Sequence, residues 1–144
     1  MSPKPKITVT DFQLMKDRGE KITLLTAYDY SMARIIDTAG IDAILIGDSL
    51  GMVMYGNSST LQVTVDDMVR HTQAVSSGVS HAMVIADMPF LSFALPEDAV
   101  KNAGRLIQEG QADAVKLEGG KERIESIRLL LSAGIPVMGH IGLT

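Results

Sequence analysis

The sequence has 144 residues, of which 46% are hydrophobic and 21% are charged, and its formal net charge at neutral pH is −4. This composition is typical of one globular domain with an aliphatic core, because aromatic residues make up only 4% of the chain. The acidic balance excludes the electrostatic footprint of a nucleic-acid-binding protein, and the absence of cysteine excludes disulfides and thiolate metal sites.

In chain order, residues 1–6 carry charge but are not followed by an apolar run, so we expect no signal peptide. No stretch approaches the roughly 20 apolar residues that a membrane-spanning helix needs. We therefore expect a cytoplasmic protein that binds neither nucleic acid nor a membrane.

Short apolar runs then alternate with longer amphipathic ones. The short runs predict five strands, at residues 22–27, 41–47, 83–86, 112–117 and 135–139. Helices are predicted at residues 11–18, 29–39, 64–78, 96–110 and 121–133. Asp29 and Thr64 are the expected N-caps of two of them, and Gly40 is an expected left-handed stop. The Gly- and Ser-rich residues 51–63 show no helical period and are predicted to form a polar loop.

Strands that alternate with helices of about 12 residues indicate parallel βαβ units, because parallel neighbours need a crossover. Both an open doubly wound sheet and a closed barrel fit this order, and the strand around residues 113–118 favours the barrel. There Ala114, Lys116 and Glu118 share one face, while Val115 and Leu117 share the other. One apolar face beside a face that ends in charges is typical of a barrel strand whose interior opens into a site.

We therefore expect an α/β fold, a (β/α)8 TIM barrel that needs about 250 residues in all. Residues 1–144 would supply about the first five βα units, as the N-terminal portion of a single domain with no second domain. The side chains expected to point into the barrel include Ile44, Ile46, Met83, Ile85 and Met138.

Polar residues stand at the ends of the second to fifth predicted strands, namely Asp48 with Ser49, then Asp87, Glu118 and His140. In a parallel barrel these ends meet on one face, where active sites are built. Three carboxylates there would repel one another unless a cation neutralised them. Asp48, Asp87 and Glu118 are therefore predicted ligands of Mg²⁺ or Mn²⁺, although each alone could be a simple turn former or helix cap. Lys116 is predicted to hold a substrate carboxylate, with an ordinary ion pair to Glu118 as the alternative.

Residues 47–51 also match G-x-S-x-G, the nucleophile elbow of serine hydrolases, and Ser49, Asp87 and His140 follow the chain order of such a triad. That motif needs a helix directly after the serine, which residues 51–63 do not predict. Ser49 is therefore expected to bind an anionic ligand instead. His71 and His81 are expected to be plain surface residues.

Seven segments, in register from about residue 8 to the last residue, resemble the ketopantoate hydroxymethyltransferase family. They are Thr26–Asp29, Gly47–Met52, Ser59–Leu61 with Val63–Asp66, Ala86–Phe90, Asn102–Gly104, Val115–Gly120 and Gly139–Thr144. Two positions depart from the family pattern, since Gln62 replaces a common proline and Asn57 stands where an acidic residue is frequent.

The resemblance implies transfer of a hydroxymethyl group from 5,10-methylenetetrahydrofolate to 3-methyl-2-oxobutanoate, giving 2-dehydropantoate, through an enolate stabilised by Mg²⁺. This is the first committed step of pantothenate and coenzyme A synthesis, and family members are usually cytoplasmic homo-oligomers, as decamers. Asp48, Asp87 and Glu118 fall on the Mg²⁺-associated carboxylates of the family. Asp48, Ser49, Asp87 and Lys116 fall on its 2-oxoacid contacts, and His140, which lies nearby, is also expected to bind the substrate. The general base of the family, a glutamate, would lie beyond residue 144, so no catalytic residue is expected in this chain.

Two other functions remain open from the sequence. One is a Mg²⁺-dependent 2-oxoacid C–C lyase of the isocitrate lyase and phosphoenolpyruvate mutase type, whose barrels also use acids at strand ends. The other is a fragment that binds metal or ligand without turnover. We expect residues 1–144 alone to be inactive as a transferase.

Overall fold

The computed structural model describes residues 5–142, which contain one five-stranded sheet in which every neighbouring pair is parallel. The strands are β1 (Leu24–Thr26), β2 (Ala43–Ile46), β3 (Met83–Asp87), β4 (Ala114–Glu118) and β5 (Val137–His140). They lie in the same order in the sheet as in the sequence. This order confirms the predicted repeat of parallel βα units.

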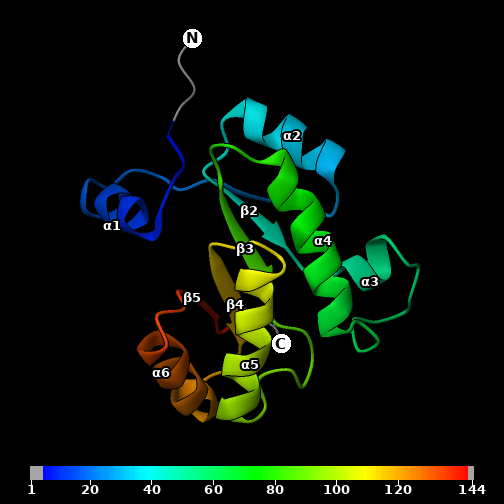
Figure 1. Cartoon of the computed structure of the whole chain (residues 1–144). Coiled ribbons are helices and arrows are strands. Elements are labelled where there is room, and N and C mark those ends of the chain that lie inside the picture. The colour runs from blue at the N-terminus through cyan, green and yellow to red at the C-terminus, as the bar shows by residue number, and fades with distance from the viewer. Residues whose placement is uncertain (1–4, 143–144) are drawn as a thin grey trace.

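Four helices cover the outer face of the sheet (Figure 1): α2 (Tyr30–Ala39), α4 (Val65–Gly78), α5 (Pro96–Gln108) and α6 (Ile124–Ser132). The core between these helices and the strands is aliphatic, as the composition predicts. Its fully buried side chains include Ile44, Ile46, Val84, Val115 and Leu117 from the strands and Met68, Val75, Leu106 and Leu130 from the helices.

The inner face of the sheet carries a second, smaller apolar cluster, which contains Ala43, Met83, Ile85 and Ala114 with Leu45 and Met138 packed against it. The register pairs Ala43 with Met83 and Leu45 with Ile85, so these side chains share the inner face. Met83, Ile85 and Met138 therefore lie where the sequence predicts.

The prediction for Ile44 and Ile46 is wrong, because both side chains point outward into the helical layer. The physical reason is that every residue of β2 is apolar. Side chains alternate between the two faces of a strand, and in an entirely apolar strand nothing in the sequence marks which two face the barrel interior.

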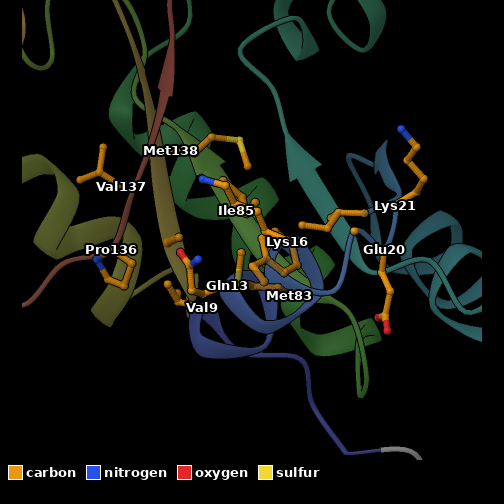
Figure 2. A pocket seen from close by; sticks show the side chains of 14 residues that line it. Val9, Gln13, Lys16, Glu20, Lys21, Met83, Ile85, Pro136, Val137 and Met138 are labelled. Atoms are coloured by element: carbon orange, nitrogen blue, oxygen red, sulfur yellow. The ribbon is translucent and has the colours of Figure 1, made fainter.

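Helix α1 (Val9–Asp17) lies at the N-terminal ends of the strands. The Ile7 N–H donates to the His81 carbonyl at 2.7 Å, and Lys6 Nζ lies 2.9 Å from Asp113 Oδ2. Figure 2 shows the hollow between α1 and the inner face of the sheet, which has a volume of about 860 Å³ and includes Met83, Ile85 and Met138 in its lining. This hollow lies at the opposite end of the strands from Asp87 and Glu118.

Local signals predict the helix ends well. Thr64 caps α4 in a reciprocal capping box with Asp67, and Asp29 caps α2 by accepting from the Met32 N–H at 2.9 Å. Gly40 adopts a left-handed conformation with φ of 84° at the end of α2, as predicted.

Two helical segments differ from the prediction. A one-turn helix, α3 (Leu50–Val53), begins directly after Ser49 inside the segment expected to be a loop. The segment predicted as one helix at 121–133 begins with a 3₁₀ turn, η1 (Lys121–Arg123). One turn is too short for a hydrophobic period to show in the sequence. No helix within residues 5–142 has both the length and the apolar character that crossing a membrane requires.

Candidate site at the C-terminal ends of the strands

Four charged or titratable side chains meet at the C-terminal ends of β3, β4 and β5. The register places Asp87 beside Lys116 and Glu118 beside His140 on neighbouring strands. Lys116 Nζ lies 2.6 Å from Asp87 Oδ1 and 3.4 Å from Glu118 Oε1, and His140 Nδ1 lies 2.7 Å from Glu118 Oε1. The sheet itself therefore builds an alternating row of acidic and basic groups.

Asp87 is the most deeply buried member of this row, with only 10% of its side chain exposed. Its Oδ2 accepts the Asp48 N–H at 3.2 Å, which ties the end of β3 to the end of β2. Burial raises the pKa of Asp87 to about 6, even though the Lys116 ammonium acts in the opposite direction. The site therefore holds a carboxyl group that changes charge close to neutral pH.

The other ionisable groups respond to the same surroundings. Burial lowers the pKa of Lys116, but the carboxylates of Asp87 and Glu118 outweigh this effect and leave that pKa above its ordinary value. Burial raises the pKa of Glu118, but the hydrogen bond with His140 and the charge of Lys116 bring it below its ordinary value. Lys116 is therefore a cation at neutral pH, and Glu118 is an anion.

Asp48 completes the group of acids from the end of β2. Burial raises its pKa, the Thr60 hydroxyl lowers it through a hydrogen bond, and the charge of Glu118 raises it further. The effect of Glu118 on Asp48, and of Asp48 on Asp87, shows that the three predicted ligands share one electrostatic environment. The structure thus brings Asp48, Asp87 and Glu118 to the same end of the barrel.

A divalent ion fits this donor set in kind, since three carboxylates provide the oxygen ligands and negative charge that Mg²⁺ prefers. However, within residues 5–142 no three His, Asp or Glu side chains stand in the arrangement of a ready metal site. The Lys116 ammonium instead lies within reach of both Asp87 and Glu118. The metal role of the three acids therefore stays a prediction.

Ser49 lies near the acids without forming a hydrolase triad. Its Oγ is 2.9 Å from the hydroxyl of Tyr28, whereas His140 pairs with Glu118 and Asp87 pairs with Lys116. The sequence-based reason for doubting the triad was wrong, because α3 does begin directly after Ser49. The geometry nevertheless leaves Ser49 without a histidine base.

The glycine before Asp48 leaves space for the Ser49 side chain. A Cβ on Gly47 would lie 2.7 Å from Ser49 Oγ and 3.5 Å from Asp87 Oδ2. The first distance is shorter than any ordinary van der Waals contact, so a larger residue would displace the serine hydroxyl. Gly47 therefore leaves room for the Ser49 hydroxyl in its observed position, whereas the distance to Asp87 would be an ordinary contact.

Sequence reasoning missed Tyr28 and His71 next to the site, and it misjudged His81 at the other end of β3. Tyr28 contacts Ser49, and half-buried His71 contacts both the Tyr28 carbonyl and the Tyr55 hydroxyl. His81 is also half-buried, with Nδ1 2.7 Å from the Pro5 carbonyl oxygen. The prediction that both histidines are plain surface residues was wrong, because pairing between distant segments leaves no local signal. The place of Tyr28 in the Thr26–Asp29 segment was the one available hint.

Comparison with known sequences gives a consistent result. The model of the family described as ketopantoate hydroxymethyltransferase matches residues 6–144. Proteins named 3-methyl-2-oxobutanoate hydroxymethyltransferase are similar to the chain at 61% identity in Clostridium botulinum (strain 657 / Type Ba4) and 58% in Acetivibrio thermocellus. These matches cover 95% and 96% of the chain and 50% of each relative. The chain therefore spans about half the length of the curated relatives it matches.

Solved structures confirm the fold class. Phosphonopyruvate hydrolase, in a complex with oxalate and Mg²⁺, is similar with a TM-score of 0.72 at 17% identity, over 92% of this chain and 52% of that one. A 2,3-dimethylmalate lyase of the PEP mutase/isocitrate lyase superfamily is similar with a TM-score of 0.66 at 19% identity, over 94% of this chain and 53% of that one. These enzymes have TIM-barrel folds, and the chain provides five βα units of such a barrel.

Proposed function

Because the chain belongs to the ketopantoate hydroxymethyltransferase family, we propose that a full-length enzyme containing it transfers a hydroxymethyl group from 5,10-methylenetetrahydrofolate to 3-methyl-2-oxobutanoate. The product is 2-dehydropantoate. The observation that carries this proposal is the identity of 58–61% to relatives named for this activity. The row of acids around Lys116 at the strand ends gives the proposal a chemical basis.

The substrate has two groups that this site can hold, a carboxylate and a neighbouring keto oxygen. Lys116 is proposed to bind the carboxylate, because its side chain is only 12% exposed and its ammonium already pairs with carboxylates on the inner face. The Ser49 hydroxyl is proposed to donate a second hydrogen bond to the same anion. Asp48 and Asp87 would contact the 2-oxoacid through its metal ion, and His140 would hold Glu118 in place.

Asp48, Asp87 and Glu118 would hold the Mg²⁺ ion. When bound, the ion would supply positive charge that stabilises the negative charge developed when the 2-oxoacid loses its C3 proton. The ion and the Lys116 ammonium compete for the same carboxylates, so we propose that Lys116 turns from Asp87 to the substrate when both are bound. The general base, a glutamate by family resemblance, is proposed to lie beyond residue 144. Leu143 and Thr144, the end of the Gly139–Thr144 segment, lie outside the described residues.

The remaining parts of the proposal concern the setting of the reaction. We propose that the enzyme is cytoplasmic and acts in pantothenate and coenzyme A synthesis, as relatives with this name would. We also propose a homo-oligomer, a decamer by family resemblance. The apolar side chains on α2, where Ile35 is 66% exposed and Met32 and Tyr30 are also exposed, mark a surface that the remaining barrel units or another subunit would cover in the full-length enzyme.

The test is turnover by the purified full-length enzyme with 3-methyl-2-oxobutanoate and methylenetetrahydrofolate, measured as 2-dehydropantoate formed. We expect activity that chelation removes and Mg²⁺ restores, and that Glu118→Gln lowers strongly. Asp98→Asn is a control, since Asp98 is exposed in the first turn of α5. Wild-type enzyme that forms no product would refute the proposal, and cleavage of 2-methylisocitrate would favour the lyase alternative.

A further inference from the structure

A chain of hydrogen bonds connects Ser49 with three elements outside the row of acids. Tyr28 lies two residues after β1, and its hydroxyl is 2.9 Å from Ser49 Oγ. Both side chains are half-buried. Tyr28 therefore touches the site from a strand that contributes no charged group to it.

His71 on α4 holds Tyr28 from the other side. Its Nδ1 is 2.6 Å from the Tyr28 carbonyl oxygen, and its Nε2 is 2.9 Å from the Tyr55 hydroxyl. A carbonyl oxygen only accepts hydrogen bonds, so Nδ1 must carry the proton. In the neutral ring Nε2 is then an acceptor, and the Tyr55 hydroxyl donates to it at 2.9 Å in preference to Asp67 Oδ1, which lies farther away at 3.4 Å. His71 thus fixes the backbone at Tyr28 and anchors the segment after α3.

We propose that Tyr28 is a positioning residue, held by His71, which orients the Ser49 hydroxyl toward an anionic 2-oxoacid. The inference rests on the proposed function for the identity of that anion. An anion accepts hydrogen bonds, so Ser49 must donate its only hydroxyl proton to the ligand. The Tyr28 hydroxyl must then donate to Ser49 Oγ. Donation from Tyr28 to Ser49 Oγ makes the Ser49 hydroxyl a stronger donor to the ligand and favours one of its staggered rotamers.

The matched pair of variants for this role is Tyr28→Phe and Tyr30→Phe, since each change removes one phenolic hydroxyl. The hydroxyl of Tyr30, a residue 45% exposed, contacts only Arg34 among the described side chains, at 3.3 Å. We expect Tyr28→Phe to weaken binding of 3-methyl-2-oxobutanoate by about five- to tenfold, the usual range for one lost hydrogen bond. Tyr30→Phe should leave binding unchanged.

A double-mutant cycle then separates positioning from a general structural effect. Ser49→Ala should weaken binding of the 2-oxoacid at least as much as Tyr28→Phe does. Adding Tyr28→Phe to Ser49→Ala should cause no further loss, because the phenol acts only through the serine hydroxyl. Losses that simply add would overturn the inference. The thermal transition of each variant shows whether the fold is retained.

Two substitutions of His71 test the upstream link, because each keeps one of its two hydrogen bonds. The side-chain amide nitrogen of asparagine stands near the Nδ1 position, so His71→Asn can still donate to the Tyr28 carbonyl. The amide of glutamine reaches the Nε2 position, so His71→Gln keeps only the partner on Tyr55. We expect near wild-type 2-oxoacid binding for His71→Asn and a loss of several-fold for His71→Gln. Weaker 2-oxoacid binding by His71→Asn than by His71→Gln would show that His71 acts through its contact with Tyr55, and this would contradict the inference.

The experiment uses the full-length enzyme with Mg²⁺, and it measures 2-oxoacid binding by calorimetry without folate and turnover with folate. The KM for 3-methyl-2-oxobutanoate should rise in Tyr28→Phe, while the KM for the folate stays unchanged. Wild-type enzyme that binds the 2-oxoacid without turnover would refute the proposed transferase activity. The double-mutant cycle of Tyr28→Phe and Ser49→Ala would then still test the positioning role of Tyr28. Active wild-type enzyme with equal 2-oxoacid binding in Tyr28→Phe would overturn only this inference.

Discussion

If Asp87 is a ligand as proposed, the affinity of the full-length enzyme for Mg²⁺ should fall as the pH drops through about 6, because a carboxyl group must lose its proton to bind the ion. Burial raises the pKa of this carboxyl from 3.8 to about 6. About nine-tenths of such groups are ionised at pH 7 and about one-tenth at pH 5. Proton and metal compete for the same oxygens. The affinity for Mg²⁺ should therefore be about tenfold weaker at pH 5 than at pH 7, which corresponds to a loss of ~1.4 kcal/mol in binding free energy. The pKa of Asp48 is also raised, chiefly by burial, and acts in the same direction.

Calorimetric titration with Mg²⁺ between pH 5 and pH 8 measures this dependence directly. Asp87→Asn should bind the ion more weakly at pH 7 and should lose most of the change near pH 6, because it replaces the titrating ligand with a neutral one. Asp98→Asn makes the same chemical change on the exposed surface of α5 and should behave as wild type. Equal affinity of the wild type at pH 5 and pH 7 would refute the assignment of Asp87 as a buried metal ligand.

Three further predictions follow from contacts in the structure. Lys116→Ala should mainly raise the KM for 3-methyl-2-oxobutanoate, and Lys116→Arg should restore little of the loss. A covalent adduct trapped at Lys116 with borohydride would show a covalent role instead. Gly47→Ala should weaken 2-oxoacid binding, because the new Cβ would meet Ser49 Oγ at 2.7 Å, while Gly104→Ala, with open space around it, should not. Leu117 is fully buried, so Leu117→Ala should lower the free energy of unfolding by about 2–5 kcal/mol. Urea titration measures this loss, and a value below about 1 kcal/mol would contradict the observed packing.

The sequence predicts the repeating βα units well because their signals are local. The caps at Asp29 and Thr64 need only neighbours within three residues, and the left-handed stop at Gly40 needs only one. The inner face of β4 is also correct, because Lys116 and Glu118 mark one of its two alternating sets. A charged residue in a strand thus gives the alternation a direction that purely apolar β2 lacks.

Contacts between distant segments are what the sequence could not predict. The pairing of Asp87 with Lys116 depends on the register of β3 against β4, which no single segment specifies. The contact of His71 with Tyr28 joins residues 43 positions apart, so neither residue carries a local sign of it. The candidate site was therefore predicted as a set of residues together with the ion pair of Lys116 and Glu118, while the pairing of Lys116 with Asp87 and of His140 with Glu118 came from the structure.

The row of charges also gives a physical reason to expect a divalent ion at this end of the barrel. Even with the Lys116 ammonium 2.6 Å away, Asp87 ionises less readily than a carboxyl in water, as its pKa of about 6 shows. The difference from the ordinary value of 3.8 corresponds to about 3 kcal/mol of unfavourable free energy for the carboxylate at neutral pH. One monovalent cation therefore does not offset the burial of this group, which also lies beside Asp48. A second positive charge at the strand ends would stabilise both carboxylates and leave the ammonium for a substrate anion, so the deficit in charge itself favours metal binding here.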